Sequence, residues 1–118
     1  MTARILAVGD DLLVSSRIVE AAKRIGARVE TTSSGDETIA RMADDDPYVI
    51  VVDLGMAGLD LDAIAAAARG RGIPVVAFYP HVDVELRRSA RRAGIEHVYA
   101  RSRFLRETSV ILRERLGG

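Results

Sequence analysis

The chain has 118 residues, of which 48% are hydrophobic and 29% are charged. This size and composition fit one globular domain with a core of its own. There is no cysteine, which excludes a disulfide framework and a thiolate metal site. No apolar stretch approaches the roughly 18–20 residues that a membrane span needs, so we expect a cytoplasmic protein that makes no membrane contact.

The charges balance overall but are unevenly distributed along the chain. Residues 1–68 carry 6 basic and 12 acidic side chains, whereas residues 69–118 carry 11 basic and 5 acidic ones. The basic half has two interpretations: solvated helix faces, which we favour, or a docking surface for an acidic partner. Nearly all of the positive charge is arginine, and Lys23 is the only lysine.

The first part of the chain alternates strand and helix patterns. The apolar run Arg4–Gly9 is typical of a buried strand, and apolar residues then recur at three- and four-residue spacing up to Ile25, which predicts a helix. A second, weakly alternating strand is predicted over Arg28–Thr32. Ser34 followed by Glu37 has the spacing of a capping box and predicts the start of a second helix.

The second part of the chain continues the same alternation. Tyr48–Val52 is apolar throughout, as expected of a parallel strand covered on both faces. After a loop that contains two glycines, Asp60 is placed to cap a third helix. The remaining predicted elements are a strand at Ile73–Phe78, a helix capped by Asp83, a short strand at Glu96–Ala100, and a last helix from Arg103 to Leu116.

Five such alternations of strand and helix predict a parallel sheet with helices on both faces. The sequence has no internal repeat, linker or low-complexity tract. We therefore expect residues 1–118 to form a single α/β domain with the flavodoxin-like (βα)5 fold and the strand order 2-1-3-4-5.

Three aspartates follow two of the predicted strands. Asp10 and Asp11 end the first strand and Asp53 ends the third, and for the order 2-1-3-4-5 the topological switch point lies between these two strands. Clustered carboxylates repel each other, and Mg²⁺, which prefers oxygen ligands, would relieve this repulsion. A carboxylate can also attack phosphorus and form an aspartyl phosphate. The alternative is that each aspartate caps the helix that follows it, which is the more frequent role for any one of them.

With these features the sequence resembles the CheY-like receiver domains of response regulators over nearly its whole length. The resemblance implies that Asp53 is the phosphoacceptor, that Asp10 and Asp11 are a magnesium-binding pair, and that Gly55 completes the metal shell with its backbone carbonyl. It also implies a stand-alone receiver that works with a histidine kinase or phosphotransfer protein and a downstream target. The matched features are Asp10–Asp11, Arg17–Val19, Asp53, Pro74 and Ala93–Gly94.

The sequence departs from the receiver pattern at the positions that transmit activation. Tyr79 stands where receivers carry a threonine or serine, and Val98 where they carry an aromatic residue. Arg101 replaces the usual lysine, and we expect it to form a salt bridge with Asp53. Tyr79 is expected to be strand-end filler or a lid over the pocket. The pattern predicts an atypical receiver with intact acids and an altered response.

The predicted fourth helix carries four arginines on one broad face: Arg87, Arg88, Arg91 and Arg92. In receivers the surface formed by the fourth helix, fifth strand and fifth helix is the usual partner or homodimer face. The basic residues therefore favour an acidic protein partner. Nucleic acid is disfavoured because no aromatic residues interleave this face and the net charge is zero.

Three functions remain open from the sequence. The first is an atypical stand-alone receiver phosphorylated on Asp53, and the second is a degenerate pseudo-receiver that acts as a phosphorylation-independent interaction module. The third, which we favour least, is a magnesium-dependent phosphotransfer enzyme or a flavin-binding protein on the same fold. No glycine-rich phosphate loop or aromatic pair supports it, so we expect no enzymatic activity.

Overall fold

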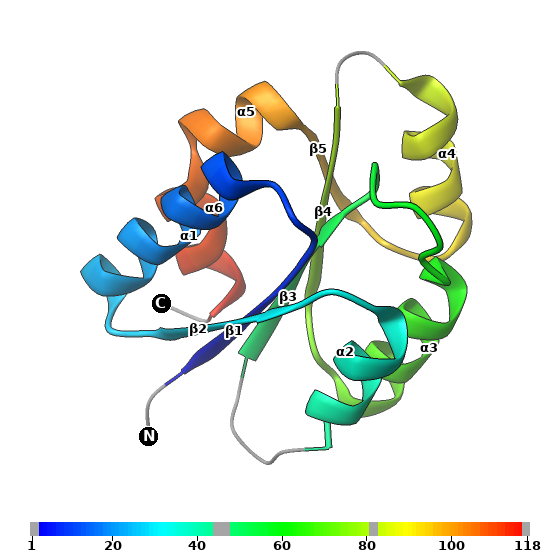
Figure 1. Ribbon diagram of the computed structural model, residues 1–118, viewed down its shortest axis with the longest axis horizontal. Coiled ribbons are helices and arrows are strands. Elements are labelled where there is room, and N and C mark those ends of the chain that lie inside the picture. Colours follow the sequence, from blue (N-terminus) through cyan, green and yellow to red (C-terminus); the bar gives the residue numbers. More distant parts are fainter. Residues whose placement is uncertain (1–2, 44–47, 81–82, 117–118) are drawn as a thin grey trace.

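The structure is a computed structural model that describes residues 3–43, 48–80 and 83–116. Strands and helices alternate along the described chain, as predicted (Figure 1). The strands are β1 (Arg4–Val8), β2 (Arg28–Thr32), β3 (Tyr48–Asp53), β4 (Val75–Tyr79) and β5 (His97–Ala100). The helices are α1 (Leu12–Ile25), α2 (Gly35–Arg41), α3 (Leu61–Arg71), α4 (Val84–Arg92), α5 (Arg101–Arg106) and α6 (Thr108–Arg115).

The strands form one sheet in the order β2-β1-β3-β4-β5, and every neighbouring pair is parallel. The predicted fold class is therefore confirmed. β1 is buried along its whole length and β3 along all but its last residue, because both lie in the middle of the sheet and are apolar apart from Arg4 and Asp53. The strand order brings the carboxyl ends of β1 and β3 side by side, with Val8 opposite Val52.

Two hydrophobic cores lie on opposite faces of the sheet, because successive side chains of a strand point to opposite sides. The first core, the α2–α4 core, receives Leu6 and Ile50 from the sheet. The second, the α1/α6 core, receives Ile5 and Val49 together with Phe104 of α5. Figure 1 shows this division, with α2, α3 and α4 on one side of the sheet and α1, α5 and α6 on the other.

Four helices begin at a side chain that accepts a hydrogen bond from the backbone N–H three residues further on, which satisfies one free donor of the first turn. The predicted caps at Ser34, Asp60 and Asp83 are confirmed. The fourth cap is Asp11 at the start of α1. One of the candidate site residues therefore also has the structural role that the sequence left open.

The prediction of a single last helix from Arg103 to Leu116 is wrong. The chain forms two helices, α5 and α6, which meet at Glu107 with φ −118° and ψ 23°. The hydroxyl of Thr108 donates to the backbone oxygen of Phe104, a contact that competes with the regular helix pattern and bends helices. The helical segment also starts earlier than predicted, at Arg101 directly after β5.

None of the described helices is both long enough and apolar enough to cross a membrane.

Candidate functional site

An open cleft of about 540 Å³ lies at the carboxyl edge of the sheet. The register explains its walls, because Asp53 is paired with Phe78, and Tyr79, the residue after Phe78, is paired with Ala100. The cleft is therefore built where β3, β4 and β5 end and where α5 begins. Its lining residues are Asp11, Asp53, Gly55, Phe78, Pro80, Ala100, Arg101 and Ser102.

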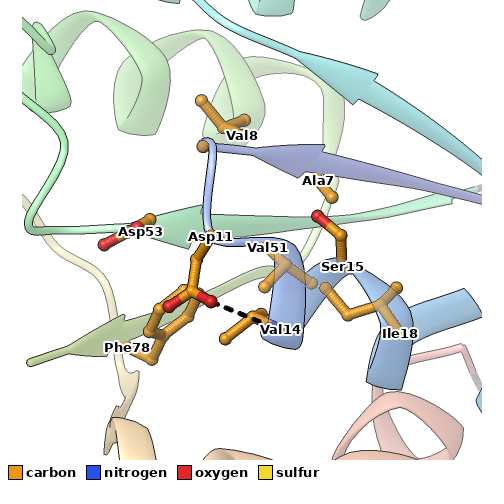
Figure 2. Close-up of a pocket in the computed structure, with 10 residues that line it drawn as sticks. Ala7, Val8, Asp11, Val14, Ser15, Ile18, Val51, Asp53 and Phe78 are labelled. Carbon is orange, nitrogen blue, oxygen red and sulfur yellow. Dashed lines mark hydrogen bonds between the residues drawn. The ribbon is translucent and has the colours of Figure 1, made fainter.

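Asp11 is held from two directions. Its Oδ1 accepts the N–H of Val14 at 3.2 Å, which caps α1 (Figure 2). Arg101 donates from Nε to Oδ2 at 2.7 Å and from Nη2 to Oδ1 at 3.2 Å. The pKa of the Asp11 carboxyl lies below its ordinary value, and the charge-assisted hydrogen bonds from Arg101 are the largest cause. The carboxylate of Asp11 is therefore fixed in place and ionised.

Asp53 is half-buried at the end of β3. Its Oδ1 accepts the backbone N–H of Gly55 at 2.9 Å, which turns the chain back over the strand end. Burial raises the pKa of the Asp53 carboxyl, and the negative charges of Asp11 and Asp10 raise it further. The hydrogen bond from Gly55 opposes that shift. Asp53 is thus an accessible carboxylate in an acidic environment, as the sequence predicted.

The three aspartates are not gathered into one ligand set. Asp10 is exposed, and both oxygens of Asp11 are already bonded. Among the residues that the structure describes, no group of three or more His, Cys, Asp or Glu side chains is placed to hold a metal ion. The predicted magnesium ligands Asp10, Asp11, Asp53 and Gly55 therefore do not fit the ion in the present arrangement, because Arg101 stands at Asp11.

The predicted salt bridge between Arg101 and Asp53 is wrong, since Arg101 pairs with Asp11 instead. The reason is the early start of α5, which places Arg101 in its first turn and within two hydrogen bonds of the α1 cap. Arg101 still acts on Asp53 through space, because its charge partly offsets the raised pKa of that carboxyl.

Comparison with known proteins gives no match at the level of sequence families: no family model and no curated protein matches the chain. Solved structures do match it. The receiver domain of the sensor histidine kinase PA1611 from Pseudomonas aeruginosa, with magnesium coordinated in its active site cleft, aligns at a TM-score of 0.77 and 24% identity over 100% of both chains. A putative response regulator from Chloroflexus aurantiacus aligns at 0.81 and 18% identity, again over 100% of both chains. The chain has the receiver-domain fold.

A third similar structure is full-length FixJ from B. japonicum, with a TM-score of 0.78 and 16% identity. The alignment covers 99% of this chain but only 59% of FixJ. At such identities the likeness establishes a common fold, and the chemistry has to be argued from the residues of the cleft.

Two of the altered switch positions of this receiver fold lie away from the cleft. The side chains of Tyr79 and Val98 both pack against the α2–α4 core. Tyr79 is absent from the residues that line the cleft. This favours a packing role for Tyr79 at the end of β4 over a role as a lid on the cleft. Tyr99 packs in the α1/α6 core, on the opposite face from Val98 as the strand period predicts.

Sequence reasoning missed four residues that shape this site. Phe78, Pro80 and Ser102 line the cleft, and Gly9 lies directly against Asp53. A signal for Pro80 and Ser102 was available, because each follows a predicted strand at the same edge as the acids. Gly9 could have been noticed as the residue that joins a strand to the acidic pair.

The four arginines of α4 are exposed, as the predicted partner face requires. Arg88 pairs with Glu85 at 3.1 Å, and Arg92 donates to the hydroxyl of Ser89 at 3.3 Å. Both contacts are local to the helix, and exposed pairs of this kind contribute little to stability. The charge of this face is therefore open to a partner.

Proposed function

We propose that this protein is a receiver-like signalling module in which Asp53 accepts a phosphoryl group. The observation that carries the proposal is the position of Asp53, a half-buried carboxylate that ends β3 and opens into the cleft. An oxygen of Asp53 attacks the phosphorus of a phosphohistidine or an acyl phosphate. The donor's P–N or P–O bond breaks, and the leaving imidazole or carboxylate keeps the bonding electrons, the imidazole then gaining a proton from water.

The charge of the cleft supports this chemistry. Among the described residues that line it, Arg101 carries the positive charge, and a guanidinium binds phosphoryl oxygens well because its N–H groups form a fork. We infer that Arg101 faces the charge that develops at Asp53. A histidine kinase or a phosphotransfer protein is the donor that we propose. We include no magnesium ion in this step, because Arg101 is bonded to both oxygens of Asp11.

Incubation with acetyl phosphate is expected to add one phosphoryl group to the wild-type protein and none to Asp53→Asn. Intact-mass spectrometry measures the addition, and tryptic mapping locates it after reduction of the acyl phosphate with borohydride. Asp36→Asn is the matched control, because Asp36 is exposed in the first turn of α2 and lies outside the cleft. An unmodified wild-type protein, or equal modification of Asp53→Asn, would contradict the proposal.

A second function is favoured by the altered switch positions. Tyr79 packs against the α2–α4 core and Arg101 is held by Asp11. These two residues therefore do not supply the small hydroxyl and the free lysine that receivers use. We propose as the alternative a phosphorylation-independent interaction module. Its contact surface is α4, β5 and α5, where an acidic protein or a second copy of the chain meets the basic face.

Changing both Arg88 and Arg92 to glutamate is expected to abolish most binding of the acidic protein or of the second copy of the chain. The double change replaces two positive charges with two negative ones on an exposed surface, and like charges facing a partner repel it. Affinity capture with quantitative mass spectrometry, together with sedimentation for the homodimer, provides the measurement. Arg41→Glu with Arg71→Glu is the matched control, since both lie exposed in the last turns of α2 and α3. Equal loss in both double variants would count against a specific α4 surface.

A further inference from the structure

The pair formed by Arg101 and Asp11 uses the forked donor geometry of a guanidinium. Two different nitrogens, Nε and Nη2, reach the two oxygens of one carboxylate. Residues 90 positions apart in the sequence are joined in this way. The two side chains are 34% and 23% exposed, so the pair is partly shielded from water and is screened less by salt than a surface pair.

These contacts occupy the atoms that a metal ion would need. Oδ2 of Asp11 accepts from Arg101, and Oδ1 accepts from both Arg101 and Val14. Mg²⁺ requires ligand oxygens at about 2.0–2.1 Å in a nearly ideal octahedron. The guanidinium cannot lose its proton, so an ion at Asp11 would stand beside a permanent positive charge. Binding of the ion therefore requires that Arg101 leaves.

We propose that Arg101 is the resident cation of this cleft, standing at Asp11 in place of a divalent ion, so that the wild-type protein has no saturable magnesium site and removal of Arg101 creates one. Among the residues that the structure describes, the cleft lining contains two carboxylates, Asp11 and Asp53, and one guanidinium, that of Arg101. The positive charge is thus supplied by the chain itself. The inference concerns the resting cleft and does not require that Asp53 accepts a phosphoryl group.

The choice of arginine over lysine fits this role. An ammonium group is a compact point charge that can contact one oxygen and move away, whereas a guanidinium binds both oxygens of a carboxylate as a fork. Arg101 also lies in the first turn of α5, and Phe104 of the same helix is completely buried. The backbone that carries Arg101 is therefore anchored by the core, and the pair is held without a metal.

The test is a titration of the whole protein with magnesium chloride, followed by amide NMR shifts, with sodium chloride added to match ionic strength at every point. No phosphoryl donor is present, so failure of phosphorylation at Asp53 does not affect the result. The wild-type protein is expected to show no saturable shifts at millimolar Mg²⁺. Arg101→Ala is expected to show saturable shifts at Asp11 and Asp53 over the same range of Mg²⁺ concentration.

Arg106→Ala is the matched control. Arg106 lies on the same helix, is 70% exposed and pairs with Glu107 at 3.6 Å, so its loss should leave the wild-type behaviour unchanged. Arg101→Gln, which is neutral but keeps N–H donors, replaces Arg101→Ala if that variant does not fold. Saturable magnesium binding by the wild-type protein would overturn the proposal. Equally absent binding in the Arg101 variant would overturn it as well, because another feature would then exclude the ion.

Discussion

Replacement of Phe104 with alanine is expected to lower the free energy of unfolding by about 3–5 kcal/mol. Phe104 is completely buried, and its ring stacks on Phe78 with centroids 5.3 Å apart and an interplanar angle of 19°. The change removes the buried ring area and the stacking contact, and it leaves a cavity between α5 and the sheet. Urea unfolding followed by circular dichroism measures the loss.

The effect of this substitution should extend to the cleft. Phe78 lines the cleft and Arg101 begins the helix that Phe104 anchors, so loosening of α5 should weaken the pair between Arg101 and Asp11. We expect the Nε–H signal of Arg101 to move toward its free value in the variant. Leu105→Ala is the control on the same helix, because Leu105 is only half-buried in the same core. If both variants lost the same stability, Phe104 would not be the anchor.

The arrangement of the sheet was predictable from local patterns. β1 and β3 are short, mostly apolar runs, and such runs are typical of a parallel strand that is covered on both faces. Five alternations predicted a parallel sheet with helices on both faces, and the order 2-1-3-4-5 is the one expected for the flavodoxin-like fold of the receivers that the sequence resembles. The caps at Ser34, Asp60 and Asp83 were predictable for the same reason, since a cap depends only on residues three positions apart.

The contacts within the cleft were not predictable in this way. Asp11 and Asp53 could be placed because each follows a strand, but the partner of Arg101 depends on where α5 starts and how far a long side chain reaches. Helix α5 starts at Arg101 and not at the predicted Arg103. In the structure the guanidinium of Arg101 pairs with Asp11 and not with the predicted Asp53. The break at Glu107 escaped prediction because the hydrogen bond from Thr108 competes with a helix that propensity alone would continue.

Replacement of Gly9 with alanine is expected to destabilise the protein by about 1–3 kcal/mol and to displace Asp53. Gly9 has φ +148°, a region that side chains with a Cβ rarely adopt. A Cβ at this position would lie 2.8 Å from the Cβ of Asp53. The register makes this approach unavoidable, because Val8 is opposite Val52 and the next residues on the two strands meet. The absence of a Cβ at Gly9 therefore leaves room for the side chain of Asp53 at the end of β3.

Gly58→Ala separates the two causes of the lost stability, which are backbone strain and the collision with Asp53. Gly58 also has positive φ, +73°, but nothing lies within 4 Å of a Cβ added there, so its substitution carries the backbone strain without the collision. Gly9→Ala should therefore lose more stability in urea unfolding, and it should also shift the Asp53 and Gly55 amide signals, which Gly58→Ala leaves in place. Equal losses in the two variants, with an unmoved Asp53, would mean that the sheet edge yields to the added methyl group and that the position of the Asp53 carboxylate does not depend on Gly9.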